Sequence, residues 1–195
     1  AYASVIPAMR EISLFVQSFL SKKRLALFRV RGAPALLKSW FFSGIILIIL
    51  ALTWPRLFFP FGWLCLIFLL EPLNYWLKNE TFLKDLKKRD WTRFWSWLLA
   101  GLVAGFLWEF WNFWAGSHWE YSLPYLNFWR VFQMPVFGYT GFLPFALEVF
   151  ALYQLLFALY KKLQRKVVLK SIIIILLLLF YAGGFYLIDT FSLIR

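Results

Sequence analysis

The chain has one cysteine and one histidine in 195 residues, and only 9 acidic residues against 21 Lys and Arg. A single cysteine, Cys65, excludes an intrachain disulfide and a cysteine cluster for zinc or iron–sulfur binding. A single histidine, His118, cannot supply both axial ligands of a bis-histidine haem. The motifs of serine hydrolases, zinc proteases and phosphate-binding loops are also absent. We therefore expect no metal centre, and the sequence names neither a cofactor nor a catalytic chemistry.

The sequence also lacks a Ser/Gly-rich linker, a low-complexity tract and a fixed-period repeat, so nothing divides it into separate domains. What it has in excess is apolar character, because 63% of its residues are hydrophobic, 23% are aromatic and its mean hydropathy is +0.70. These values exceed those of soluble domains. They predict an all-α integral membrane protein.

Five apolar segments are candidates for membrane-spanning helices, since a helix needs about 20 residues to cross a bilayer. They cover residues 40–54, 57–70, 94–114, 136–160 and 171–188. The first two are short and are broken by Pro55, Arg56 and Pro60, so residues 40–70 either cross twice or form a re-entrant hairpin. We expect about five transmembrane helices in one polytopic domain, residues 39–195.

Regions rich in Lys and Arg alternate along the chain with regions that have few of them. Eighteen of the 21 Lys and Arg lie before residue 40, at 77–93 or at 161–170. Positive charge marks cytoplasmic loops, which predicts a cytoplasmic N-terminus, an outer loop at residues 115–135 and an external C-terminus. The net charge of +12 is thus explained by basic residues in cytoplasmic loops of a membrane protein. We therefore expect no nucleic-acid partner.

The first 38 residues differ from the rest of the chain. One helical face carries Ile12, Phe15, Val16 and Phe19, and five basic residues follow at positions 22–31. This amphipathic pattern predicts a helix on the cytoplasmic membrane surface, held by its apolar face and by anionic lipid. Docking of the helix on a partner protein is the alternative.

The stretch GLVAGFLWEFWNFWAG, residues 101–116, is apolar and aromatic but contains a carboxylate. One helical face is formed by Gly101, Gly105, Glu109 and Asn112, which recur every three or four residues. Small residues at this spacing let another helix approach closely. A carboxylate in hydrocarbon costs at least about 2.5 kcal/mol, so we expect this face to meet protein. Glu148, in the next segment, is the second intramembrane carboxylate, and we expect both to border one polar pocket.

Partners for these carboxylates are expected in the outer loop. The candidate ligand-binding residues are Glu109, Asn112, His118, Arg130 and Glu148. The aromatic residues of this loop also suit an interfacial belt, and a structural hydrogen bond between helices is the alternative role for the carboxylates. Glu71 lies at a cytoplasmic helix end, where we expect it to be hydrated.

Three classes of function fit these residues. We favour a membrane subunit or binding protein whose aromatic-rich pocket between the third and fourth spans holds a lipid, quinone, pigment or partner helix. A membrane-embedded enzyme acting on a lipid or isoprenoid, with Glu109 and Glu148 as acid and base, is the second. A proton-coupled transporter is the third, and the absence of an inverted repeat counts against it. The expected partners are membrane lipids and other membrane subunits.

The motifs EPLNYW, WEFWN and QMPVFGYTGFLPFALE lie within residues 71–148. Their combination resembles bacterial multi-spanning inner-membrane proteins without an assigned activity. The resemblance implies a location in the bacterial inner membrane and brings no substrate or catalytic residue with it.

Overall fold

The structure is a computed structural model that describes residues 2–20, 34–58, 61–121, 128–164 and 166–191. It is 83% helical, and four helices are long and apolar enough to cross a membrane. This confirms the expected all-α class and is consistent with a membrane protein.

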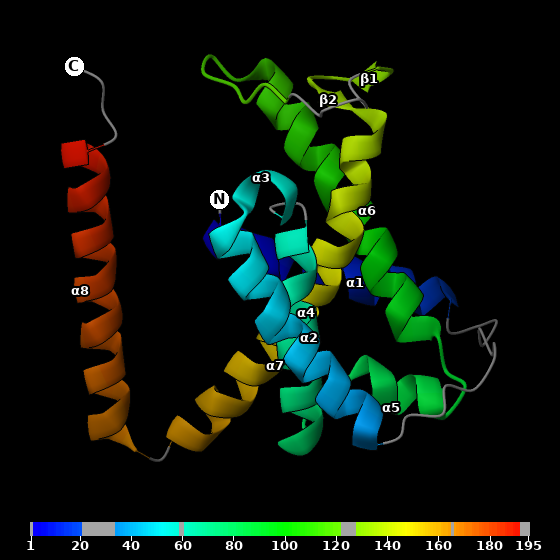
Figure 1. Cartoon of the computed structure of the whole chain (residues 1–195), viewed down its shortest axis with the longest axis vertical. Coiled ribbons are helices and arrows are strands. Elements are labelled where there is room, and N and C mark those ends of the chain that lie inside the picture. Colours follow the sequence, from blue (N-terminus) through cyan, green and yellow to red (C-terminus); the bar gives the residue numbers. More distant parts are fainter. Residues whose placement is uncertain (1, 21–33, 59–60, 122–127, 165, 192–195) are drawn as a thin grey trace. The chain divides into compact units, whose positions relative to one another are not determined.

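The elements follow the chain from α1 to α8, with one short hairpin between α6 and α7 (Figure 1). They are α1 (Tyr2–Leu20), α2 (Pro34–Thr53), α3 (Pro55–Phe58), α4 (Gly62–Trp76), α5 (Phe82–Lys87), α6 (Thr92–Trp114), β1 (Arg130–Val131), β2 (Met134–Pro135), the 3-10 helix η3 (Val136–Gly141), α7 (Phe142–Leu163) and α8 (Val167–Phe191). The chain forms two compact units, residues 1–155 and 156–195, and the boundary falls within α7.

The four helices of spanning length match four of the five apolar segments. They are Ala35–Thr53, Thr92–Trp114, Val136–Leu163 and Val167–Tyr186. The fifth segment corresponds to α4, which has 15 residues and is therefore about 22 Å long at 1.5 Å per residue. That is less than the ~30 Å thickness of a bilayer's hydrocarbon core. The difference arises because Pro55 starts a new short helix and α4 begins only at Gly62.

The helices α2 and α4 pack against each other. A Cβ at Gly44 of α2 would lie 2.8 Å from Leu69 Cγ and 3.1 Å from the Cys65 carbonyl oxygen of α4. Trp40 and Phe68 add an edge-on ring contact at 5.8 Å between centroids. α2 and α4 are thus closely packed, and a side chain at position 44 would require Leu69 and the Cys65 backbone to shift.

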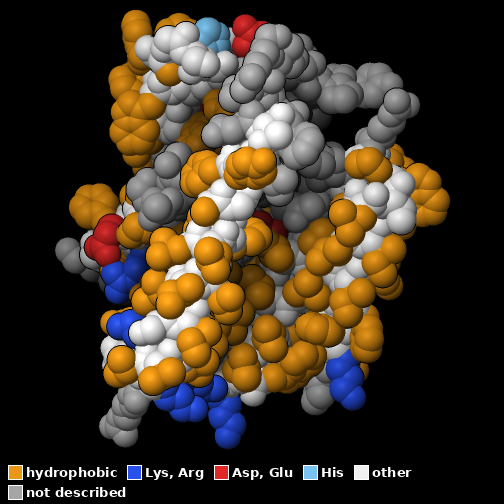
Figure 2. Space-filling view, turned by 90° about the vertical axis from the view of Figure 1, so that its left-hand side faces the viewer, with side chains coloured by type: hydrophobic (Ala, Val, Ile, Leu, Met, Phe, Trp, Pro, Cys, Tyr) orange, Lys and Arg blue, Asp and Glu red, His pale blue; other side chains and the backbone are white. Residues whose placement is uncertain are grey.

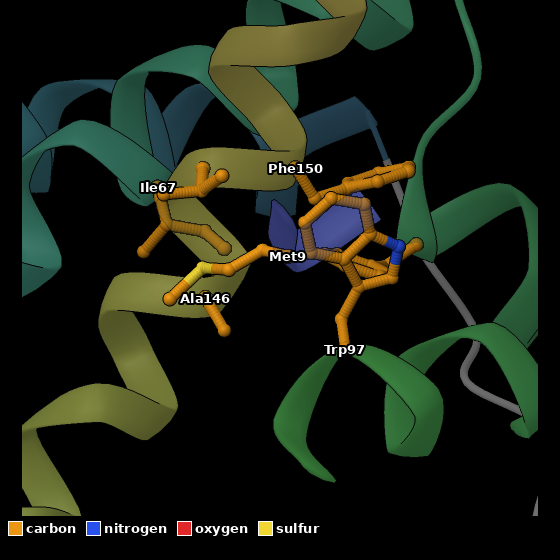
Figure 3. Packing of buried hydrophobic residues seen from close by; sticks show 7 residues of the cluster. Met9, Ile67, Trp97, Ala146 and Phe150 are labelled. Atoms are coloured by element: carbon orange, nitrogen blue, oxygen red, sulfur yellow. The ribbon is translucent and has the colours of Figure 1, made fainter. Parts of the chain in front are cut away.

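The core of the first unit lies where α1, α4, α6 and α7 meet. These helices contribute Met9, Ile67, Trp97, Ala146 and Phe150 to one buried cluster (Figure 3). The ring centroid of Phe150 lies 5.3 Å from that of Trp97. In a bilayer such packing, rather than the exclusion of water, holds helices together.

The helix α1 forms as expected, but it packs by a face that the amphipathic pattern did not predict. Met9 and Ser13 are 1% and 2% exposed, whereas Phe15 and Phe19 are 65% and 59% exposed. The Ser13 hydroxyl donates to the Arg10 carbonyl oxygen at 2.7 Å, so its burial leaves no donor unpaired. One side of α1 therefore packs on α6, and Phe15 and Phe19 of the predicted apolar face point outward, while Ile12 and Val16 are half-buried. The basic positions 22–31 lie outside the described residues.

The second unit contains the end of α7 and the whole of α8. Most apolar side chains described along α8 are exposed, and none of its spanning window is buried. A helix that is apolar all round suits a lipid environment. Figure 2 shows helices whose outer surface is mostly hydrophobic.

Candidate functional site

The face of α6 that carries Glu109 is turned toward protein, as the sequence predicted. Gly101, Gly105, Glu109 and Asn112 are all buried. The opposite face is exposed and carries Leu102, Val103, Phe106 and Phe110. The polar side chains of this helix are thus withdrawn from the surface that would meet lipid.

The two glycines of this face let α6 approach the start of α7. A Cβ at Gly101 would lie 2.7 Å from the Cβ of Ala146 and closer still to the Phe142 carbonyl oxygen. A Cβ at Gly105 would lie 2.5 Å from the Phe142 ring. The prediction that this face packs on the helix carrying Glu148 is therefore confirmed.

Asn112 ties α6 to the loop that follows it. Its side-chain Nδ2 donates to the Trp119 carbonyl oxygen at 2.9 Å, and the Trp119 backbone N–H donates to its Oδ1 at 2.7 Å. Nδ2 also lies 3.4 Å from Glu109 Oε2. Because one amide side chain pairs with both polar groups of a loop residue, the chain must fold back over the C-terminal end of α6.

Glu109 is fully buried beside this connection. Its Oε2 faces Asn112, and no hydrogen-bond donor contacts its Oε1 in the described part of the chain. Tyr121 approaches the same carboxyl from the loop: burial raises the pKa of Tyr121 to about 12, and the nearby Glu109 carboxyl adds to this shift. Tyr139 of η3 also lies close enough to interact electrostatically with Glu109. The carboxyl is enclosed by aromatic side chains, and one of its oxygens has no donor.

A short hairpin that the sequence did not reveal lies over the same end of α6. Its strands β1 and β2 pair antiparallel, and Phe132 at its turn has φ 57°, a region that costs a bulky residue about 1–3 kcal/mol. The Phe132 ring packs on three rings of α6, those of Phe106, Phe110 and Phe113, at 5.5–5.9 Å. Tyr139 secures the hairpin by donating to the Val131 carbonyl oxygen at 3.1 Å.

Two of the predicted candidates lie at the edge of this region. Arg130 donates to the Tyr121 carbonyl oxygen at 3.3 Å and so supports the residue that contacts Glu109. His118 lies 3.8 Å from the exposed Glu120 carboxylate. Arg130 is linked to the Glu109 region through Tyr121, while His118 belongs to the surface.

Glu148 has different neighbours from Glu109. It is 5% exposed and lies against the Leu66 backbone and Cys65 of α4. Its Oε1, like that of Glu109, has no donor among the described residues. The structure therefore does not bring the two carboxylates to one pocket, because Glu148 faces α4 while Glu109 faces the loop after α6 and η3.

A third buried carboxylate, Glu71, corrects the expectation that this residue is hydrated. Glu71 is 1% exposed and accepts the Leu83 backbone N–H at 2.8 Å. One turn further on α4, Asn74 donates to the Ala151 carbonyl oxygen at 2.7 Å. The return of the chain through α5 buries this end of α4, which no local pattern could indicate.

Charged residues around α5 form ion pairs that hold it to α6. Arg93 Nη1 donates to Glu80 Oε2 at 2.9 Å, and Arg93 Nε lies 3.2 Å from Asp85 Oδ2. The hydrogen bond from Arg93 lowers the pKa of Glu80, whereas burial raises the pKa of Asp85 in spite of Arg93. Ion pairing within the fold accounts for these residues without a ligand.

No group of three metal-ligating side chains occurs within the residues that the structure describes. No family model, curated protein or solved structure matches the chain. Function therefore has to be argued from the residues themselves.

Proposed function

We propose that the chain is a membrane-embedded binding protein or subunit whose site is centred on Glu109, at the outer end of α6. Its ligand is the polar head of an amphiphile, such as a lipid, quinone or pigment, or a polar side chain of a partner helix. The bacterial inner membrane is the proposed location.

The observation that carries this proposal is the unpaired Oε1 of Glu109. The neighbouring polar groups are used: Asn112 is committed to Trp119, and Arg130 supports Tyr121. A buried polar atom without a partner costs about 1–3 kcal/mol, and ionisable groups inside a membrane commonly mark functional sites. A ligand that donates a hydrogen bond to Oε1 would remove this cost.

The aromatic side chains beside Glu109 favour an amphiphile. Tyr121 and Tyr139 face the carboxyl, and Trp111 and Trp114 on the same end of α6 are 65% and 72% exposed. Tyrosine and tryptophan prefer the level of the lipid headgroups, where an amphiphile presents its polar part. An enzyme that used Glu109 and Glu148 as acid and base would need them together, and their separate neighbours argue against it.

The proposed topology follows the basic residues. We place the N-terminus and the loop that contains α5 in the cytoplasm, and the loop after α6 and the C-terminus outside. In this orientation α2 and α4 either cross the membrane twice or form a re-entrant hairpin. Both arrangements return the chain to the cytoplasm, so α6, α7 and α8 then make the same three crossings, and the basic residues at 161–170 support a cytoplasmic turn before α8.

Mass spectrometry of amphiphiles retained by the full chain tests the site. The chain is purified in mild detergent as wild type, Glu109→Gln and Glu148→Gln, and the bound small molecules are extracted and identified. A retained amphiphile should fall about five- to tenfold in Glu109→Gln, because a hydrogen bond to a carboxylate is worth about 1.5–3 kcal/mol and one to the neutral amide oxygen of glutamine about 0.5–1.5 kcal/mol.

Glu148→Gln is the matched control, because Glu148 is an equally buried carboxylate with an unpaired oxygen on another helix. It should retain the amphiphile. Thermal unfolding of both variants shows that they are folded. A co-purifying membrane protein lost only in Glu109→Gln would support the subunit role. The proposal fails if the wild type retains neither an amphiphile nor a membrane protein. It also fails if Glu109→Gln retains as much of the bound molecule as wild type does.

A further inference from the structure

The turn between α7 and α8 carries a dense patch of positive charge in the second unit. Its members, which we call the lysine patch, are Lys161, Lys162, Lys166 and Lys170. All four side chains are exposed. The sequence contains no Asp or Glu from residue 156 to residue 188, so no acidic neighbour along the chain neutralises this charge.

Backbone hydrogen bonds hold the patch together. The Gln164 N–H donates to the Tyr160 carbonyl oxygen at 3.0 Å, and the Lys166 N–H donates to that of Leu163 at 2.9 Å. The Lys170 N–H donates to the Lys166 carbonyl oxygen at 3.0 Å, and this hydrogen bond forms the first turn of α8. Because only residues 164–166 separate the two helices, the four lysines cannot move far apart.

Aromatic rings position two of the ammonium groups. Lys161 Nζ lies 4.3 Å from the Phe157 ring centroid, and Lys170 Nζ lies 5.9 Å from that of Tyr160. A cation over a ring within about 6 Å is attracted to it. The Lys161 ammonium thus lies beside Phe157, and the Lys170 ammonium lies beside the exposed Tyr160 ring.

The level of the patch in a membrane follows from its flanking helices. Val136–Leu163 and Val167–Tyr186 are both long and apolar enough to span, so a turn of three residues between them has to lie where the hydrocarbon ends. Phospholipid phosphates lie at this level. Val167 and Val168, which are 71% and 75% exposed, begin the apolar surface beside the lysines and can contact acyl chains.

We propose that the lysine patch, with Tyr160, is a binding site for the headgroup of an anionic phospholipid. The lysines provide positive charge without an acidic neighbour, Tyr160 provides an interfacial ring, and the valines provide contact with the acyl chains. This site is independent of the one centred on Glu109.

A lipid titration of the full chain in detergent tests this proposal by native mass spectrometry. Dioleoylphosphatidylglycerol is compared with dioleoylphosphatidylcholine, which has the same acyl chains and no net charge. Each lysine near an anionic surface contributes about fivefold, so Lys162→Gln, Lys166→Gln and Lys170→Gln together should weaken phosphatidylglycerol binding at least about tenfold. Binding of phosphatidylcholine should not change.

Two control variants distinguish binding at a specific site from attraction to the net charge of the protein. Lys78→Gln, Lys88→Gln and Arg89→Gln remove the same charge from exposed positions in the first unit and should leave binding within about twofold of wild type. Replacing the three patch lysines by arginine should keep the affinity. Equal losses in both glutamine triples, or no preference for phosphatidylglycerol, would overturn the proposal. Binding of a polyglutamate peptide in preference to phosphatidylglycerol would also overturn it, since the partner would then be an acidic protein.

Discussion

Replacing Gly101 by alanine tests the contact between α6 and α7, on which the placement of Glu109 depends. The new Cβ would lie 2.7 Å from Ala146 Cβ, about 0.7 Å less than the 3.4 Å of ordinary contact, and closer to the Phe142 carbonyl oxygen. A backbone oxygen cannot rotate away, so the two helices have to separate. Overpacking costs about 1–3 kcal/mol, while the better helix propensity of alanine returns about 1 kcal/mol.

Two other glycines provide the comparison. At Gly105 the obstructing group is the Phe142 ring, which can turn, so Gly105→Ala should cost less than Gly101→Ala. At Gly183, in the interior of α8, a Cβ meets nothing within 4 Å, so Gly183→Ala should be neutral or stabilising by up to about 1 kcal/mol.

Thermal unfolding in detergent, followed by tryptophan fluorescence, measures the differences in stability. The expected gap of about 2 kcal/mol between Gly101→Ala and Gly183→Ala corresponds to roughly 4–8 °C in Tm for a chain of this size. If Gly101→Ala melts at or above the temperature of Gly183→Ala, the glycine face does not pack on α7 and the described surroundings of Glu109 are wrong.

Substitutions at three further positions test the loops and the orientation. Asn112→Ala removes both hydrogen bonds to Trp119 and should cost about 2–3 kcal/mol, at about 1 kcal/mol a bond plus the loss of packing; limited proteolysis of residues 115–121 should become faster, and an unchanged rate would contradict the connection. Glu71→Gln keeps an acceptor for the Leu83 N–H, whereas Glu71→Ala removes it. The Glu71→Ala variant should therefore be less stable than the Glu71→Gln variant by about 1–3 kcal/mol. Equal melting temperatures of the two variants would show that this hydrogen bond is not formed. Ser117→Cys should react with a membrane-impermeant maleimide from outside, and reaction only from the cytoplasmic side would reverse the topology.

The helices of spanning length could be predicted from the sequence because length and hydropathy are local properties. α6 and α8 needed no knowledge of the rest of the chain. α4 was predicted less well, since its start depends on how the chain passes Pro55 and the residues after it. The hairpin β1–β2 could not be predicted, because Phe132 has a positive φ that three rings of α6 hold in place.

The candidate site was predicted in part for the same reason. Helical periodicity places Glu109 and Asn112 on the glycine face, and the structure has them there. The contact between Glu148 of α7 and α4 depends on tertiary packing. It could therefore not be predicted from the sequence. Glu71 was misjudged because the return of the chain through α5, with Leu83 donating to its carboxylate, is what buries it.

Whether α1 is part of the fold or an attachment to the membrane surface is decided by two of its side chains. Met9 is 1% exposed in the cluster shared with α4, α6 and α7, whereas Phe15 is 65% exposed. Met9→Ala should therefore cost about 2–5 kcal/mol in the free energy of unfolding, and Phe15→Ala should stay within about 0.5 kcal/mol of wild type. Thermal unfolding of the full chain compares them directly. A larger loss at Met9 means that residues 2–20 complete the core; a larger loss at Phe15 would show that α1 is rotated and packs by its amphipathic face.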